Sequence, residues 1–265
     1  MVNGYVITFC PGSSGRFIAN IVFQMKNSVE KPLNLTEENS AHNDKEYCDP
    51  SKIKFPNGDH SINVDFSHIG LFKYIKFLPS SNINILHTHE FPRFSDWSIN
   101  PNKDSFKIII ITIDKESSPE VCGNALIKNT ISLLKKSKEE LSLIEKIWVS
   151  STRKRWIVEK KYPLTPGVFN DQEIFKNSVK RFQTRKDVNE FTDAEISKEF
   201  GDVILELKYK ELFAKDKQGN FITLLKLSQW LDVPITENII SEYEKYAQGR
   251  INLIQNKMPW LNSSS

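Results

Sequence analysis

Residues 5–25 read YVITFCPGSSGRFIANIVFQM, and they predict a strand, a tight turn and a helix in direct succession. Residues 5–10 are β-branched and aromatic and stop at a Pro-Gly pair, which is typical of a short buried strand. From Arg16 onward, apolar residues recur at helical spacing, at Phe17, Ile18, Ile21, Val22 and Met25. The turn at residues 11–16 therefore lies between the end of a strand and the N-terminus of a helix.

The composition of this turn favours the binding of an anion. A turn of this kind points backbone N–H groups and a helix dipole at one anion. Gly12 and Gly15 allow close backbone approach and positive φ. Ser13 and Ser14 add hydroxyl donors, and Arg16 can bind phosphate or sulfate oxygens bidentately. The alternative is a plain strand-to-helix connection, because such turns are common in α/β proteins.

The rest of the chain alternates between strands and helices. Further strands are expected at 83–87, 106–113 and 203–207, and helices at 118–126, 131–148, 171–182, 193–200, 221–231 and from Thr236 to about 253. This alternation predicts an α/β fold with a doubly wound, mainly parallel sheet flanked by helices. We expect one domain over 1–265, with a loop-rich insertion at 27–61 and a C-terminal helix and tail at 236–265.

Composition and charge argue against several classes of protein, including nucleic-acid-binding, membrane-spanning and zinc-binding proteins. Charged residues make up 26% of the 265 residues and the net charge is +3, which permits an anionic ligand without indicating nucleic acid. The longest apolar run, around Ile108 to Ile113, is far shorter than the roughly 20 residues of a membrane helix. The N-terminus has no signal-peptide pattern, and Cys10, Cys48 and Cys122 have no zinc-ligand spacing. We therefore expect a cytoplasmic protein without a membrane partner.

The turn matches one family of phosphate-binding loops better than another. A Walker loop needs Gly-x-x-x-x-Gly-Lys-Ser/Thr, but Arg16 stands at the lysine position and Phe17 replaces the magnesium-binding hydroxyl. The turn instead resembles that of the sulfotransferases, whose first strand ends in a Pro-Lys-Ser-Gly-Thr-Thr-type loop. The resemblance implies that residues Gly12 to Phe17 bind the 5′-phosphosulfate end of 3′-phosphoadenosine-5′-phosphosulfate (PAPS), with no metal, in a three-layer architecture like that of P-loop NTPases.

Three later segments resemble the same family in the same order, so that the resemblance spans most of residues 5–245. Residues 85–92 (ILHTHEFP) are similar to its Thr-His-x-x-Pro strand end, which implies that His89 is the general base. Residues 107–113 match the strand that leads to its 3′-phosphate contacts. Residues 205–212 (LELKYKEL) and 224–234 (LLKLSQWLDVP) resemble its late strand-Tyr-x-x-Leu element and following helix.

The chain departs from the family at two charged positions. Gly12 aligns with the loop lysine, and Asp114 lies near the position of an arginine that pairs with the 3′-phosphate. A carboxylate there repels a phosphate. Arg16 is the candidate substitute for the loop lysine. The candidate substitutes for the arginine are Lys115, Asn124 and Lys128.

The sequence thus suggests a sulfotransferase that acts on a hydroxyl or amine of a carbohydrate or small molecule. His89 would take the acceptor's proton and Arg16 would offset charge on the leaving phosphate. One alternative is a magnesium-dependent phosphotransferase with Asp114 as the metal ligand. Another is a non-catalytic structural or assembly protein that retains the fold.

Two further patterns have a functional and a structural interpretation. His87 and His89 share one face of a strand and could bind a metal with Glu90, His68 or His60, although an ordinary structural role is the more common one. Basic residues gather at 153–161, 180–181 and 185–186. They form either a rim for an anionic donor or acceptor or a solvated surface.

Overall fold

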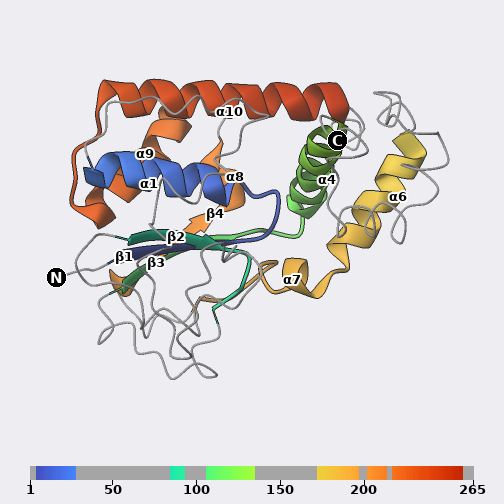
Figure 1. Ribbon diagram of the computed structural model, residues 1–265, viewed down its shortest axis with the longest axis horizontal. Coiled ribbons are helices and arrows are strands. Elements are labelled where there is room, and N and C mark those ends of the chain that lie inside the picture. The colour runs from blue at the N-terminus through green and yellow to red at the C-terminus, as the bar shows by residue number, and fades with distance from the viewer. Residues whose placement is uncertain are drawn as a thin grey trace.

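The computed structural model describes residues 4–27, 84–92, 106–134, 172–196, 202–213 and 217–258. Within these ranges the chain forms a parallel sheet with strand order β2-β1-β3-β4 (Figure 1). Its strands are β1 (Gly4–Phe9), β2 (Asn84–Thr88), β3 (Phe106–Thr112) and β4 (Ile204–Lys208). In the central strand, Tyr5 lies opposite Ile85 of β2 on one side and Lys107 of β3 on the other.

The order of the strands creates a switch point between β1 and β3. The chain passes from β1 to β2 at one side of the sheet, and from β3 to β4 at the other. The connections after β1 and β3 therefore leave in opposite directions. In open α/β sheets, ligands bind in the crevice outside the carboxyl ends of strands at such a point.

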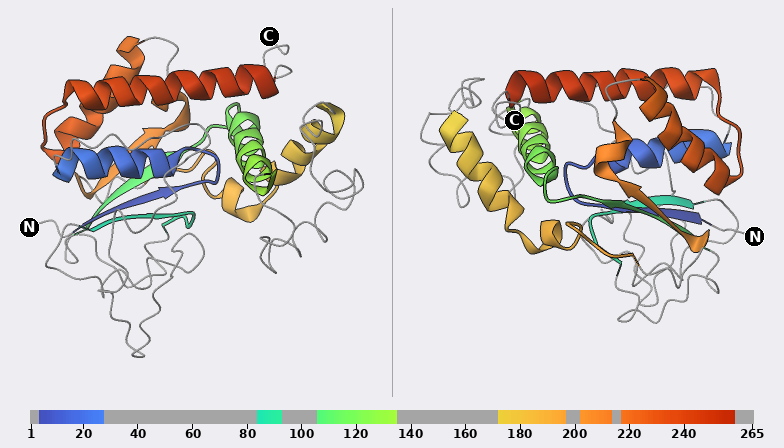
Figure 2. Two further views of the ribbon diagram at one scale, coloured as in Figure 1. Left: turned by 45° about the horizontal axis from the view of Figure 1, so that its top comes forward. Right: turned by 180° about the vertical axis from the view of Figure 1, so that it is seen from behind.

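The described helices lie on one face of the sheet and beyond its carboxyl edge (Figures 1 and 2). The long helices α1 (Gly15–Asn27), α9 (Lys217–Leu231) and α10 (Glu237–Lys257) stack on one face, with α10 outermost. Beyond the carboxyl ends of the strands stand α4 (Ser118–Leu134) and α6 (Gln172–Gln183). The short helices α7 (Lys186–Asn189) and α8 (Tyr209–Leu212) follow α6 and β4.

The core is built on the apolar strands of the sheet. Every residue of β1 is buried, and β3 (FKIIIIT) is buried except for Lys107. Near-continuous apolar runs of this kind are typical of parallel strands, which are covered on both faces. Helix α1 packs between the sheet and helix α10, and Phe17, Ile18 and Ile21 are fully buried there. The pattern of apolar residues therefore accounts for the burial. These residues form unbroken runs in the strands and recur at helical spacing in α1.

The described elements confirm the α/β class and the parallel sheet, with strand bounds within one residue of the prediction. Two details of the predicted helices differ. The residues expected to be helical at 118–126 and from 131 onward are helical, but without the expected break, because α4 runs unbroken to Leu134. Of the helix expected at 193–200, residues 197–200 lie outside the described residues, and residues 193–196 are not helical. The main chain of Ile113 pairs there with Phe191 and Asp193, and Asp193 has a φ of 52°.

Two of the predicted segments lie partly or wholly outside the described residues. The insertion expected at 27–61 lies outside the described residues beyond Asn27, as does the helix expected at 131–148 beyond Leu134. Within the described ranges, no helix has the length and apolar character needed to cross a membrane.

Candidate functional site

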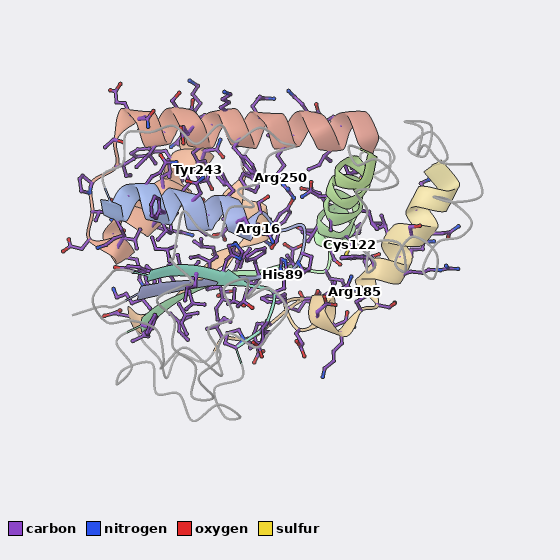
Figure 3. All side chains as sticks on the ribbon, viewed as in Figure 1. Arg16, His89, Cys122, Arg185, Tyr243 and Arg250 are labelled. Carbon is purple, nitrogen blue, oxygen red and sulfur yellow. The ribbon has the colours of Figure 1, made fainter. Side chains whose placement is uncertain are left out.

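Four strand ends bring the chemistry-bearing residues to one edge of the sheet. The turn at residues 10–15 follows β1, His89 follows β2, Asp114 follows β3 and Tyr209 follows β4. Because the strands are parallel, all of these segments lie at the carboxyl edge, which is where the switch point lies. Figure 3 shows Arg16 and His89 at this edge, with Arg250 between α1 and α10.

The turn after β1 is closed by Ser13. Its backbone N–H donates to the carbonyl of Cys10 at 3.0 Å, and its hydroxyl donates to the same oxygen at 2.7 Å. Ser13 is fully buried, so its one O–H donor is used inside the turn. Two residues of the turn have left-handed φ values, Gly12 at 95° and Ser14 at 63°. Ser14 is 6% exposed.

Both glycines of the turn are required by packing inside the protein. A Cβ atom on Gly12 would lie 2.1 Å from the carbonyl oxygen of Val121 and 2.9 Å from the amide nitrogen of Ala125, both on α4. A Cβ atom on Gly15 would lie 2.0 Å from the ring of Phe9. The absence of side chains at these two positions therefore lets the turn fit between β1 and α4. This packing accounts for the glycines whether or not a ligand binds.

Arg250 of α10 holds the turn through hydrogen bonds. This residue was not among those predicted from the sequence. Its Nη1 atom donates to Ser14 Oγ at 2.8 Å, and Nη2 donates to the carbonyl of Gly12 at 3.0 Å. The Tyr246 hydroxyl also donates to Ser14 Oγ, at 3.2 Å. Arg250 is only 3% exposed. The one available sequence signal is that Arg250 occupies the buried face of α10, in register with Tyr243, Tyr246 and Ile254.

Arg250 also binds Tyr209 at the end of β4. Its Nε atom donates to the Tyr209 hydroxyl at 2.9 Å, and this hydroxyl donates to Glu120 Oε1 at the start of α4. Burial is the largest influence on the pKa of Tyr209 and raises it, so the phenol stays protonated and can donate. Burial opposes the charge of Arg250, but nearby Tyr209, Tyr246 and Glu120 outweigh it and raise its pKa. The guanidinium therefore remains a cation.

His89 is fixed beside the turn by a main-chain carbonyl. Its Nδ1 atom lies 3.0 Å from the oxygen of Phe9, the last residue of β1. A carbonyl only accepts hydrogen bonds, so Nδ1 carries the ring proton and Nε2 is the acceptor nitrogen. The hydroxyl of Thr8 donates to the carbonyl of Glu90, which ties the chain on the other side of His89 to β1. The structure thus places His89 next to the turn.

Asp114 stabilises the turn that leads into helix α4. Its carboxylate accepts the backbone N–H of Ser117 at 2.9 Å, and both of its oxygens accept the Ser117 hydroxyl, at 3.0 and 3.1 Å. Partial burial raises the pKa of Asp114, but the hydrogen bonds from Ser117 and the charge of Lys210 prevail and lower it overall. Its negative charge therefore lies close to the N-terminus of α4, which favours an anion.

The other predicted site residues are dispersed around the turn. Asn124 is fully buried on α4 and donates its Nδ2 proton to the carbonyl of Gly12 at 2.7 Å. The side chain of Phe17 is in the core, stacked on Tyr246 with ring centroids 3.8 Å apart, so only its main chain can face a ligand. Arg16 is partly exposed at the start of α1, and Lys115 is exposed after β3. Lys128 lies on α4.

The metal and basic-rim hypotheses receive no support from the described residues. Among them, no group of three or more His, Cys, Asp or Glu side chains could hold a metal ion. His60, His68 and the basic segment at 153–161 lie outside the described residues. Arg185 forms an ion pair with Asp187.

Comparison with known proteins adds no relative to this picture. No protein-family model matches the chain, and no curated protein matches it significantly. What the site does must therefore be inferred from the geometry of the turn, His89 and Arg250.

Proposed function

We propose that this chain transfers a sulfuryl group from PAPS to a hydroxyl or amine of a carbohydrate or small molecule. The observation that carries the proposal is the hydrogen bond between His89 Nδ1 and the carbonyl of Phe9. It orients the imidazole so that Nδ1 donates to the main chain and Nε2 is the candidate proton acceptor, beside a strand-turn-helix segment suited to an anion.

The donor would bind at the turn. The first turn of α1 has N–H groups without an intrahelical acceptor, and the helix dipole adds partial positive charge at the same place. Arg16 is partly exposed at this helix start, and Arg250 lies behind Gly12 and Ser14. Two cations and a helix N-terminus at one turn suit a phosphosulfate group.

The acceptor would bind on the side of His89. His89 Nε2 would take the proton of the acceptor hydroxyl or amine as its oxygen or nitrogen forms a bond to sulfur. The bond from sulfur to the bridging phosphate oxygen breaks in the same in-line step, and the electron pair leaves on 3′-phosphoadenosine-5′-phosphate (PAP). Arg16 would offset the charge that develops on that phosphate. Positioning and electrostatics would supply most of the rate enhancement.

One observation favours a second candidate, a non-catalytic protein that retains the fold. Contacts with α4 and with the Phe9 ring already explain why residues 12 and 15 are glycine. The turn could then serve packing alone. The magnesium-dependent alternative is less favoured, because both Asp114 oxygens accept hydrogen bonds from Ser117 at the start of α4.

Calorimetric titration with PAP, the desulfated product, tests the proposal, with ATP plus magnesium titrated in parallel. Micromolar binding of PAP in the presence of a chelator is the expected result. Tight binding of ATP that needs magnesium would instead favour the phosphotransferase. If neither nucleotide binds, the non-catalytic candidate replaces the proposal.

A further inference from the structure

The guanidinium of Arg250 makes four hydrogen bonds with described residues at and beside the turn. A guanidinium has five N–H donors in a fixed plane. Nε and Nη2 both donate to the Tyr209 hydroxyl, Nη2 also donates to the carbonyl of Gly12, and Nη1 donates to Ser14 Oγ. One side chain therefore joins α10 to the end of β4 and to both left-handed residues of the turn.

The described residues balance the charge of Arg250 only in part. The carboxylate of Glu120 lies 4.0 Å from Nη2, and its side chain is 34% exposed. Its Oε1 atom also accepts the Tyr209 hydroxyl. Among the described residues, the guanidinium otherwise contacts the Tyr209 phenol, the Gly12 carbonyl, the Ser14 hydroxyl and the rings of Tyr209 and Phe213, 5.0 and 5.3 Å away. A buried cation is costly unless it is well paired, so this one leaves positive potential at the turn.

Ser14 connects Arg250 to the ligand side of the turn, because its hydroxyl can donate a hydrogen bond to a ligand. Its hydroxyl oxygen accepts hydrogen bonds from Arg250 and from Tyr246. A hydroxyl has two acceptor sites and one donor, so its own proton is left to donate. Arg250 and Tyr246 therefore orient Ser14 Oγ as a hydrogen-bond donor at a turn that already carries N–H groups.

We infer that Arg250 is the positioning residue and main cation of the anion site, in the place of the lysine that the turn lacks at Gly12. It holds Gly12 and Ser14 in their left-handed conformations, directs the Ser14 hydroxyl, and supplies its charge from behind the turn. This inference rests on the proposed function, because the anion is taken to be the phosphosulfate end of PAPS. It assigns to a residue of the last helix the role that Arg16 was expected to fill alone.

The packing of α10 explains how a residue so distant in sequence reaches the turn. Tyr246 stacks on Phe17 of α1, with the two ring planes 3° from parallel. The Tyr243 hydroxyl donates to the carbonyl of Leu212 at 2.6 Å, which fixes α10 against α8. These contacts place the C-terminal half of α10 over the turn, where Figure 3 shows Arg250.

The test compares the wild-type protein with Arg250→Met, Arg250→Lys and Tyr243→Phe by calorimetric titration with PAP at low and moderate salt. Arg250→Met keeps the length of the side chain but removes the charge. It should lower the affinity at least tenfold and weaken its dependence on salt. Arg250→Lys keeps the charge but loses the planar fork, so it should bind with intermediate affinity and a wild-type salt dependence. Tyr243→Phe removes a buried hydrogen bond of the same helix away from the turn, and should bind PAP within twofold of wild type.

A purely structural role for Arg250 gives a different result. The affinity of Arg250→Met would then stay within twofold of wild type, or would fall equally at both salt concentrations, and either result overturns the inference. If the wild-type protein itself does not bind PAP, the proposed function fails, and hydrogen exchange in the free protein decides about Arg250. The amides of residues 12–16 should then exchange at least tenfold faster in Arg250→Met than in Tyr243→Phe. Equal exchange in the two variants would overturn the positioning role as well.

Discussion

A single main-chain carbonyl decides which nitrogen of His89 can act as a base. The oxygen of Phe9 holds the proton on Nδ1, so Nε2 is the acceptor nitrogen. This tautomer follows from the pairing of β1 with β2, which places the last residue of β1 next to the chain that leaves β2. A substitution that keeps the hydrogen bond to the Phe9 carbonyl but removes Nε2 can therefore separate the catalytic role of His89 from its structural role.

His89→Asn makes that separation. The Nδ2 group of asparagine can donate to the Phe9 carbonyl as Nδ1 does, but asparagine has no counterpart of Nε2. The variant should bind PAP within about threefold of wild type, while turnover falls by about 10²–10⁴, the usual contribution of a general base. Calorimetry and a sulfate-transfer assay with PAPS measure the two quantities. Unchanged turnover in His89→Asn would remove His89 from the mechanism.

Gly12 is a position where a single added Cβ atom should lower the stability of the protein. Its φ of 95° and the 2.1 Å approach of a Cβ atom to the Val121 carbonyl both oppose any side chain. Gly12→Ala should therefore lower the free energy of unfolding by about 2–4 kcal/mol through backbone strain and overpacking. Gly123→Ala, in the middle of α4, is the matched control. Its Cβ atom would lie 2.1 Å from Sδ of Met258, a side chain that can change rotamer where a main-chain carbonyl cannot, and alanine favours the helix, so a smaller loss than in Gly12→Ala is expected.

Urea unfolding of both glycine variants measures the difference. If Gly12→Ala unfolds at the same urea concentration as Gly123→Ala, the turn can move away from α4, and the packing explanation of Gly12 is wrong. A stable Gly12→Ala protein that no longer binds PAP would show that the turn serves a ligand as well as the fold.

Helix α4 shows what a residue pattern can and cannot predict about an element. The Ser-Pro-Glu sequence at residues 118–120 indicates a helix start, and α4 begins at Ser118. The sequence does not reveal that the carboxylate of Asp114 turns back onto Ser117, because the same residue after an apolar strand is equally typical of a magnesium ligand. The error at residues 193–196 has a related cause. Backbone pairing with Ile113 overrides a weak local preference for helix.

The contact between Asp114 and Ser117 at the start of α4 predicts a specific dependence on pH. The folded-state pKa of Asp114 is lowered, so its charge stabilises the folded protein above the unfolded value of about 3.9. That contribution is lost as the pH falls through the lower folded value. At pH 7, Asp114→Ala should lower the free energy of unfolding by about 1 kcal/mol, and Asp114→Asn by less, because the amide oxygen of asparagine can still accept the Ser117 N–H.

Urea unfolding of these two variants and the wild-type protein between pH 7 and pH 3 checks the role of this charge. The stability difference between wild type and Asp114→Asn should begin to shrink at the acidic end of this range. A difference that stays constant down to pH 3 would mean that the charge of Asp114 does not stabilise α4.

At the scale of the molecule, the pattern of apolar residues predicted the sheet but could not predict that Arg250 contacts the turn. The strands were predictable because their apolar runs are short and bounded by turn residues, as at residues 106–112. The turn, Arg16 and His89 were predictable as neighbours because parallel strands end at one edge. Arg250 was not, because its contact with Ser14 spans 236 positions and depends on how α10 lies across α1. Nothing in the local sequence of α10 encodes that crossing.

The same long-range contacts predict how a ligand should affect the whole molecule. PAP bound at the turn would interact with a segment that is tied to β1, to α4 through Asn124 and to α10 through Arg250. A ligand that binds only the folded chain should therefore stabilise it globally, by about 2.7 kcal/mol at a hundredfold excess over Kd. Urea unfolding with and without PAP measures this gain, and the Kd calculated from it should agree with calorimetry. His89→Asn should gain as much as wild type, whereas Arg250→Met should gain at least about 1 kcal/mol less at the same PAP concentration, because a tenfold loss of affinity corresponds to about 1.4 kcal/mol. A gain that requires ATP with magnesium would instead assign the turn to a phosphotransferase.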